Sequence, residues 1–172
     1  MEIAADGTAL RHPADADAGA VAAAVAASID QLVPWMPWAS ADYGEADALA
    51  WIRGQLGDAH RFVMVAPGGD LIGTCGLNEI DEQNRSANLG YWVRSDRVGR
   101  GLATAATRSL ASFGLGDAGF HRLRIVMSVR NEASRRVAEK AGAGYEGIAR
   151  GRLLLRGEFH DAHVFSFVTG DI

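Results

Sequence analysis

One segment constrains the fold of this chain more than any other. Within residues 88–104, a strand-like stretch, a short turn and the start of a helix follow one another, and Gly99 and Gly101 stand in the turn. The stretch before the turn is rich in aromatic and β-branched side chains, which favour a strand. The alanine-rich stretch after Gly101 favours a helix. A strand that leads into a helix in this way is typical of a sheet with helices packed on its faces.

The same segment predicts a binding site for an anion. Glycine lets the backbone approach a bound group closely, and the first amides of a helix lack partners within it and carry partial positive charge. Arg97 and Arg100 add two cations at the same place. A pyrophosphate group suits this arrangement, although such glycine turns also occur for packing alone. The spacing matches neither the P-loop nor the dinucleotide-binding fingerprint, because no Gly-Lys-Ser/Thr follows and no strand–helix–strand unit precedes it.

The other elements follow from hydrophobic period and turn residues. An extended start and two helices come first, then three strands joined by polar turns, then the glycine turn. The sequence therefore predicts a single α/β (α+β) domain over residues 1–172, with a mixed, mostly antiparallel sheet of about six to seven strands and about four helices, in the order β-α-α-β-β-β-α-β-α-β-β. The expected segments are 3–11, 14–32, 45–56, 61–66, 71–80, 88–94, 102–113, 121–129, 131–140, 145–155 and 163–169.

Composition limits the class of partner. The 172 residues hold 17 Lys and Arg against 21 Asp and Glu, a formal net charge of −4, so no nucleic-acid or anionic-membrane surface is expected. The alanine-rich stretch at residues 14–29 contains Asp15 and Asp17, and has neither the length of a membrane span nor the basic start of a signal peptide. The single cysteine, Cys75, excludes an internal disulfide and a cysteine-based zinc site. A cytoplasmic protein with no bound metal is expected, in which Cys75 is a small buried residue.

Five ordered motifs between residues 34 and 168 carry a resemblance to a known family. They are Pro-Trp-Met-Pro-Trp at 34–38, Ile-Gly-Thr-Cys-Gly-Leu at 72–77, Gly-Tyr-Trp-Val at 90–93, Val-Gly-Arg-Gly-Leu-Ala at 98–103, and Asn-Glu-Ala-Ser at 131–134 followed by Ala141-Gly142. In this order they resemble the GNAT superfamily of acetyltransferases, most of all its RimJ/RimL ribosomal-protein N-acetyltransferase group. The resemblance implies the GNAT fold, acetyl-CoA as donor with coenzyme A as product, and a primary amine as acceptor.

The resemblance also implies roles for individual residues. The backbone near Trp92 and Val93 would align the pantetheine arm and polarise the thioester carbonyl. Asn131 would hydrogen-bond the arm, and Ser134, one helical turn later on the same face, would protonate the departing thiolate. By position alone, Asn131 is equally a helix N-cap and Ser134 a solvated helix residue. The expected cofactor contacts are Trp92, Val93, Arg97, Val98, Gly99, Arg100, Gly101, Leu102, Ala103, Thr104, Asn131 and Ser134.

The chain departs from the family pattern at three places. Val98 stands where the signature has Gln or Arg, and Ala138 stands where many members carry a tyrosine acid. Residues 151–155 contain no acidic residue, whereas some relatives have a base there. Because the family binds the pyrophosphate largely through backbone amides, Val98 need not abolish binding.

A general base is harder to predict. Glu79, near the end of a central strand, is the candidate carboxylate. A protein α-amine has a pKa near 8, so an ordered water leading to solvent would also be sufficient. Histidine can also act as a base, and the candidates are His121, His160 and His163. Their positions in the sequence do not relate them to the glycine turn.

Three interpretations of function stay open at this point. The first is acetylation of a protein N-terminal α-amine, the second is acetylation of a small amine such as a polyamine, an aminoglycoside or an amino sugar, and the third is a non-catalytic acyl-CoA-binding module. Trp35, Trp38 and Tyr91 are expected to wall the acceptor pocket or to fill the core. A homodimer is expected from the resemblance alone.

Overall fold

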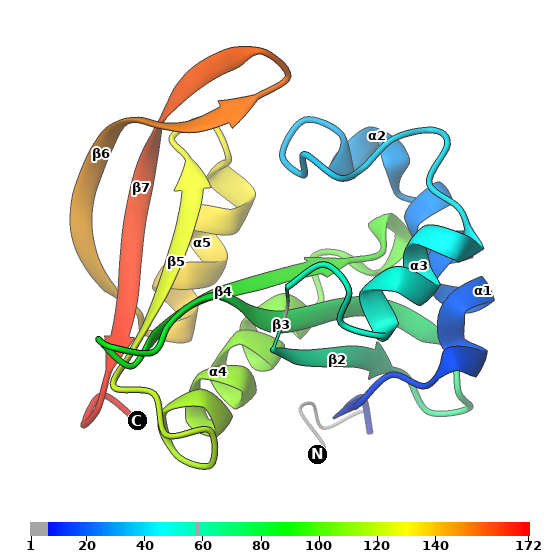
Figure 1. The fold of residues 1–172 in the computed structure, drawn as a ribbon, viewed down its shortest axis with the longest axis horizontal. Helices are drawn as coiled ribbons and strands as arrows, with labels where there is room; N and C mark the ends of the chain where they lie inside the picture. Colours follow the sequence, from blue (N-terminus) through cyan, green and yellow to red (C-terminus); the bar gives the residue numbers. More distant parts are fainter. Residues whose placement is uncertain (1–6, 58) are drawn as a thin grey trace.

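The computed structural model describes residues 7–57 and 59–172, and a seven-stranded sheet organises them (Figure 1). The strand order is β1-β2-β3-β4-β5-β7-β6, in which β4 and β5 are parallel and the other described pairs are antiparallel. The predicted α/β architecture is therefore confirmed. The elements are β1 (Ala9–Arg11), α1 (Ala18–Ala26), α2 (Ile29–Leu32), α3 (Glu45–Ile52), β2 (His60–Val65), β3 (Leu71–Asp81), β4 (Ser86–Val93), α4 (Leu102–Leu115), β5 (Arg122–Ser128), α5 (Glu132–Ala141), β6 (Gly144–Leu155) and β7 (Glu158–Val168).

The first predicted helix is divided. Residues 14–32 form a 3-10 turn followed by α1 and α2, which raises the number of α-helices from the expected four to five in the described chain. Ser28 leaves helical geometry, with φ −122° and ψ 10°. Its hydroxyl accepts a hydrogen bond from the amide of Ser95 (3.0 Å), so a long-range contact replaces the local preference for one helix.

Three other boundaries differ from the prediction by more than two residues, and one of them is the start of β7, which lies at Glu158 rather than at residue 163. Helix α3 ends at Ile52 rather than near residue 56, and Gly54 follows with a positive φ of 74°. The extended start forms a strand only at Ala9–Arg11, and residues 3–6 of that prediction lie outside the described residues.

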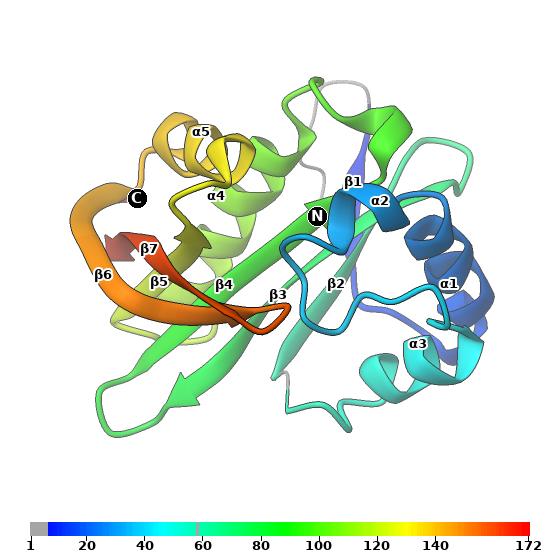
Figure 2. The same cartoon turned by 90° about the horizontal axis from the view of Figure 1, so that it is seen from above.

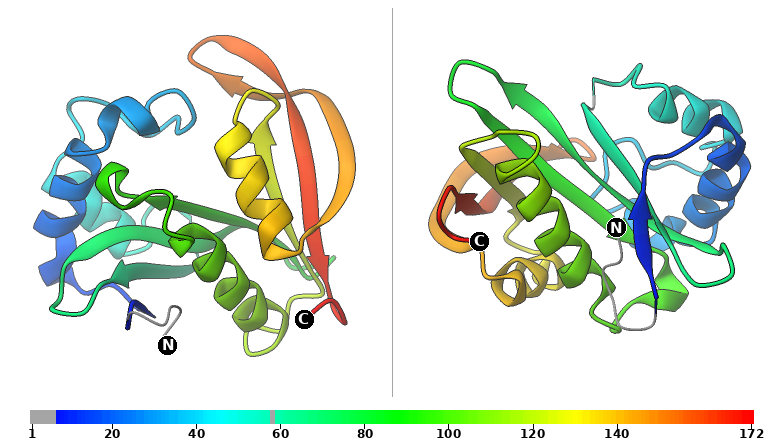
Figure 3. Two further views of the ribbon diagram at one scale, coloured as in Figure 1. Left: turned by 180° about the vertical axis from the view of Figure 1, so that it is seen from behind. Right: turned by 90° about the horizontal axis from the view of Figure 1, so that it is seen from below.

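Helices cover both faces of the sheet (Figure 2). Helices α4 and α5 pack on one face, around buried side chains that include Leu110, Leu123 and Phe165. In the view from behind they lie in front of the strands (Figure 3). Helices α1 and α3 pack on the other face, around Val21 and Val63. Each such aliphatic side chain contributes about 1.5–3 kcal/mol when it is fully buried, so the two clusters hold the strands rigidly in place.

The sheet opens between its two central strands. Strands β4 and β5 pair over only three positions, from Ser86 with Arg122 to Asn88 with Arg124. Beyond them, residues 89–93 of β4 continue to pair with β3, and β5 continues to pair with β7. The two halves of the sheet therefore diverge from this point (Figure 1).

Candidate active site

The divergence of β4 and β5 leads into a cleft of about 610 Å³. The walls come from the central strands, the loop between α2 and α3, the first turn of α5 and the end of β6, with further residues from α1 and α3. The side chains and backbone that line it include Trp35, Trp38, Cys75, Glu79, Leu89, Tyr91, Trp92, Met127, Ser128, Asn131, Ser134, Arg152 and Leu155.

The edge of β4 offers free backbone amides to this cleft. The amide of Arg94 donates to the Ile72 carbonyl on β3 (2.8 Å). Successive residues of an extended strand direct their N–H and C=O groups to opposite sides, so Val93 and Tyr91 direct theirs away from β3. Strand β5 no longer pairs at these positions. The open edge can therefore accommodate an extended chain that contains amides, which is the role that the family resemblance implies for the backbone near Val93.

The glycine turn leaves space for an anion. Gly99 and Gly101 have φ values of 77° and 78°, and a Cβ at either position would meet nothing within 4 Å. Gly101 is the N-cap of α4, so the first amides of that helix lie beside open space. Those amides belong to Leu102, Ala103 and Thr104. Val98, the residue that departs from the family signature, is 51% exposed.

The two predicted cations of the turn differ in their contacts. Arg97 binds Asp70 (2.8 Å) and Asp96 (3.5 Å), and Arg94 binds the same two carboxylates at 2.8 and 2.6 Å. Hydrogen bonds from Arg94 hold the pKa of both carboxyl groups below the ordinary range. Arg97 thus belongs to an ion-pair network, whereas Arg100 makes no ion pair with any described residue. Arg100 is therefore the cation available to a bound phosphate.

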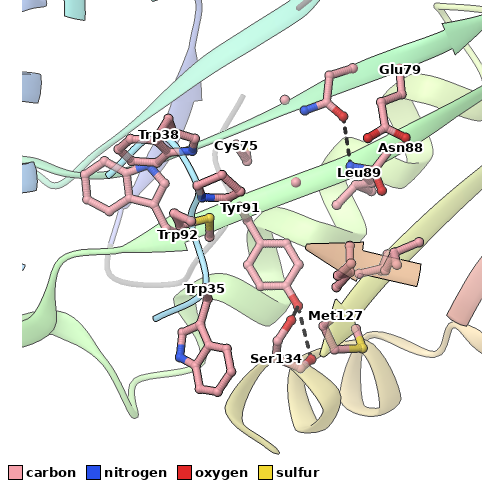
Figure 4. A pocket seen from close by; sticks show the side chains of 18 of the residues that line it. Trp35, Trp38, Cys75, Glu79, Asn88, Leu89, Tyr91, Trp92, Met127 and Ser134 are labelled. Carbon is pink, nitrogen blue, oxygen red and sulfur yellow. Dashed lines mark hydrogen bonds between the residues drawn. The ribbon is translucent and has the colours of Figure 1, made fainter. Parts of the chain in front are cut away.

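Ser134 and Tyr91 meet inside the cleft (Figure 4). The Tyr91 hydroxyl donates to the Ser134 carbonyl (3.1 Å) and lies 3.0 Å from Ser134 Oγ. Burial raises the pKa of Tyr91 to about 12, so the phenol keeps its proton and remains a donor. Asn131 caps α5 by accepting the Ser134 amide (3.1 Å), which confirms the N-cap interpretation. Ser134 therefore lies in the first turn of α5, where the helix dipole stabilises a negative charge.

Replacing Tyr91 with phenylalanine tests this contact. We expect kcat to fall about fivefold, because one hydrogen bond that orients Ser134 is worth about 1 kcal/mol, while the KM for acetyl-CoA stays within about twofold. Initial rates of coenzyme A release would measure both constants. Tyr145→Phe is the matched control, because Tyr145 also loses one hydrogen bond, to His163 (3.2 Å), but does not line the cleft. Equal effects of the two substitutions would contradict the positioning role of Tyr91.

Glu79 lines the cleft at the end where β4 and β5 still pair, beside Asn88 (Figure 4). Its carboxylate binds Arg124 (2.8 Å) and lies 3.9 Å from the guanidinium of Arg152. A carboxylate engaged by one guanidinium and faced by another is less free to contact an acceptor amine. The role of Glu79 as a base stays a prediction that these contacts do not favour.

The aromatic residues gather at the other side of the cleft. Trp35 and Trp38 come from the loop between α2 and α3 and line the opening (Figure 4). The Trp38 ring lies 5.3 Å from that of Tyr43 and 6.4 Å from that of Trp92, centroid to centroid. Trp92 is itself buried in the cluster under α1 and α3. The loop is therefore anchored to the core, and its exposed rings form a wall of the cleft.

Arg156 ties this loop to the tip of the β6–β7 hairpin. Its guanidinium donates to the carbonyls of Val33 (2.9 Å), Met36 (2.8 Å) and Ala39 (2.6 Å). In Figure 1 the tip of the β6–β7 hairpin extends toward α2 and the loop that follows it. The contact joins two segments more than 100 residues apart, 123 residues in the case of Val33, and holds the aromatic loop against the hairpin. Nothing in the sequence pattern marked Arg156 for this position.

Removing Arg156 should loosen the acceptor side of the cleft. We expect Arg156→Ala to raise the KM for the amine about tenfold, because three charge-assisted hydrogen bonds hold the aromatic loop, while acetyl-CoA binding is unchanged. Initial rates at varied amine and fixed acetyl-CoA would show this. Arg150→Ala, which removes an exposed arginine of β6 with no bonded partner in the described chain, should behave as wild type. A change in acetyl-CoA affinity alone would contradict this assignment.

The other predicted groups lie apart or are inert. His121 bonds to Thr169 (3.2 Å) and His163 to Tyr145 (3.2 Å), and neither lines the cleft. Cys75 is buried as expected, and burial raises its pKa to about 12, so it stays a thiol. Within residues 7–57 and 59–172, no group of His, Cys, Asp or Glu has the arrangement of a metal site. Among the same residues, no helix is both long and apolar enough to span a bilayer.

Comparison with known proteins decides the family. The profile of the acetyltransferase (GNAT) domain matches residues 8–144. The chain belongs to the GNAT acetyltransferase family. YdaF of Bacillus subtilis, a protein named as a ribosomal N-acetyltransferase, is 37% identical over 100 residues, which are 58% of this chain and 55% of YdaF. The ribosomal-protein-serine acetyltransferase of Escherichia coli is 26% identical over 134 residues, which are 75% of this chain and 74% of that protein. This chain thus spans only about half of YdaF.

Solved structures agree with this GNAT assignment. The ribosomal L7/L12 α-N-protein acetyltransferase RimL, solved with coenzyme A, superposes with a TM-score of 0.87 at 19% identity and covers 99% of this chain and 98% of its own. Mycobacterium smegmatis RimJ, solved with a coenzyme A disulfide, has a TM-score of 0.85 at 25% identity and covers 96% of this chain and 83% of its own. The fold of this GNAT chain is thus that of acetyltransferases of the RimJ/RimL group.

Proposed function

We propose that this GNAT protein is an acetyl-CoA-dependent N-acetyltransferase that moves acetyl directly to the α-amine of a peptide or protein N-terminus. One observation carries the proposal. A single cleft joins the free amide edge of β4 at Tyr91 to the hydroxyl of Ser134 in the first turn of α5. An acetyl-CoA molecule whose pantetheine arm bound along the β4 edge would bring its thioester toward the Ser134 hydroxyl.

The chain's own groups fit an acetyl-CoA molecule. The open glycine turn and Arg100 would hold the pyrophosphate, and the amides of Val93 and Tyr91 would hold the pantetheine arm and polarise the thioester carbonyl. Bound in this way, acetyl-CoA supplies an activated acyl group. Because the amine and the thioester are held side by side, attack becomes effectively unimolecular.

The reaction balances with one acid and one base. The amine nitrogen attacks the carbonyl carbon, and the carbon–sulfur bond breaks with its electron pair on sulfur. Ser134 donates the proton that sulfur needs, and the first-turn dipole of α5 stabilises the thiolate before that proton arrives. Tyr91, hydrogen-bonded to Ser134 Oγ, holds this hydroxyl in position. The acceptor ammonium loses two protons in all: one passes to a base before attack, and the other, released from nitrogen after attack, restores the proton of Ser134, so that one proton leaves per turnover.

The charge of the cleft supports an N-terminal amine over a polyamine. Among the described lining residues, Glu79 is the carboxylate, and Arg124 and Arg152 already bind or face it. A polyamine carries several positive charges and would find no free carboxylate there. A peptide N-terminus carries one positive charge, and its neighbouring side chains can contact the aromatic wall of the cleft. The names of YdaF, RimL and the E. coli ribosomal-protein-serine acetyltransferase point the same way.

Acetyl-CoA turnover tests the proposal. Free coenzyme A thiol is measured with peptides of varied N-termini, the same peptides with blocked N-termini, and spermidine. We expect turnover with a subset of the free peptides and none with the blocked ones. Turnover on spermidine alone would favour the small-amine interpretation, and acetyl-CoA binding without any turnover would favour a binding module. The predicted cytoplasmic location and homodimer remain predictions.

A further inference from the structure

Three side chains beside the cleft form a chain of hydrogen-bonding groups. Ser128 Oγ lies 2.8 Å from His160 Nδ1, and His160 Nε2 lies 3.5 Å from a carboxylate oxygen of Glu158. Ser128 and His160 are 2% and 9% exposed, and Ser128 lines the cleft. Glu158 is exposed to solvent and bonded to Arg130 (2.8 Å). The arrangement thus runs from the cleft, through a buried imidazole, to the surface.

Counting donors and acceptors gives the direction of this chain. A neutral imidazole has one N–H and one acceptor nitrogen. With the N–H on Nε2, facing the Glu158 carboxylate, Nδ1 accepts the hydroxyl proton of Ser128. Ser128 Oγ also accepts the amide of Arg130 (3.2 Å). One lone pair of Ser128 Oγ is left to accept a hydrogen bond from a group in the cleft.

The position of Ser128 on its strand places it opposite the proposed acid. On β5, Leu123, Ile125 and Met127 pack into the cluster under α4 and α5. Alternate residues of a strand face opposite sides, so Ser128 faces the side of the aromatic loop, whereas Ser134 comes from α5. His160 lies two residues from Ala162, the register partner of Ser128, and therefore shares its face. A proton acceptor and a proton donor thus flank the opening of the sheet from its two sides.

We propose that Ser128 and His160 are the base that the proposed function requires. The acceptor ammonium passes one proton to Ser128 Oγ while the Ser128 hydroxyl proton moves to His160 Nδ1, so the net step converts ammonium and imidazole into amine and imidazolium. Glu158 is a positioning residue that fixes the tautomer and stabilises the imidazolium. The imidazolium then loses the Nε2 proton to solvent beside Glu158. This inference rests on the proposed acetyl transfer and supplies its missing group.

The charges that bear on His160 in the described chain are few. Glu158 lies on its own strand, and Arg130 reaches Glu158 from the connection between β5 and α5. Strand β6 presents Leu153 opposite His160, and the neighbouring Arg152 is directed toward Glu79. Histidine is the side chain that most often serves as a general base, and here its two ring nitrogens join Ser128 to Glu158.

The pH profile of His160→Gln separates this base from a structural role. Gln retains a hydrogen-bonding side chain but does not titrate. We expect kcat/KM at pH 7 to fall about 100-fold, and the loss to shrink below about fivefold above pH 9, where an α-amine with a pKa near 8 is already neutral. Ser128→Ala should give the same profile, so a folding defect of one variant would not obscure the result. His163→Gln is the matched control, because His163 is a buried histidine of the same strand whose bonded partner, Tyr145, does not line the cleft.

Two results would overturn the inference. One is a loss of activity that is equal at every pH, or no loss at all, in both variants. The other comes from nitrogen NMR of the histidine-labelled wild type at neutral pH, which should show His160 with a proton on Nε2 and none on Nδ1. A proton on Nδ1 would overturn the relay even if the wild type acetylates nothing. Absence of wild-type turnover with the expected tautomer would instead contradict the proposed function.

Discussion

Replacing Ser134 with alanine is expected to lower kcat about 100-fold. The hydroxyl is the group in the first turn of α5 that can give a proton to the departing sulfur, and general acid catalysis of this kind is worth about 10²–10⁴-fold. The KM for acetyl-CoA should stay within about threefold, because the turn and the edge of β4 are untouched. Steady-state rates of thiol release at saturating peptide would measure the effect.

The control for this substitution lies on the neighbouring helix. Ser112→Ala removes an exposed serine of α4 and should leave kcat unchanged. The Asn131 cap accepts the backbone amide of residue 134, so it survives in the Ser134→Ala variant and the helix keeps its start. A kcat within about threefold of wild type would remove Ser134 from the mechanism.

Local pattern predicted those elements whose residues decide their own structure. The glycine turn is an example: Gly99 and Gly101 adopt positive φ, and α4 begins at the next residue. The Asn131 cap is another, because a capping side chain bonds within its own first turn. The division of the first helix was not predictable in this way, since the contact between Ser28 and Ser95 spans 67 residues.

The chemistry of the site depends on contacts of the same long-range kind. Tyr91 and Ser134 are 43 residues apart, and Ser128 and His160 are 32 residues apart. Serine, tyrosine and histidine occur throughout the chain, so residue type alone does not pair them. Glu79 shows the converse: its place on a central strand suggested a base, but Arg124, 45 residues away, binds its carboxylate. Only the opening of the sheet brings the useful pairs to one cleft.

Replacing Gly101 with alanine is expected to raise the KM for acetyl-CoA about tenfold. A residue with a Cβ disfavours the left-handed conformation by roughly 1–2 kcal/mol. Without acetyl-CoA the turn would therefore leave this conformation, and binding would have to recover it. A tenfold change in the dissociation constant corresponds to about 1.4 kcal/mol. Because a Cβ at this position meets nothing within 4 Å, the protein should still fold. Titration with acetyl-CoA, followed by calorimetry or by rates, would measure the change.

Gly142 provides the matched control for this last substitution. It ends α5 in the same left-handed conformation, with φ 93°, and its Cβ would also meet nothing within 4 Å, but it lies at the C-terminal end of α5, outside the glycine turn. Gly142→Ala should therefore lower the free energy of unfolding by roughly 1–2 kcal/mol and leave acetyl-CoA affinity unchanged. If both variants lose stability alike and only Gly101→Ala loses affinity, the turn binds the cofactor. If Gly101→Ala binds acetyl-CoA as wild type does, the pyrophosphate lies elsewhere, and the glycines of this turn serve packing alone.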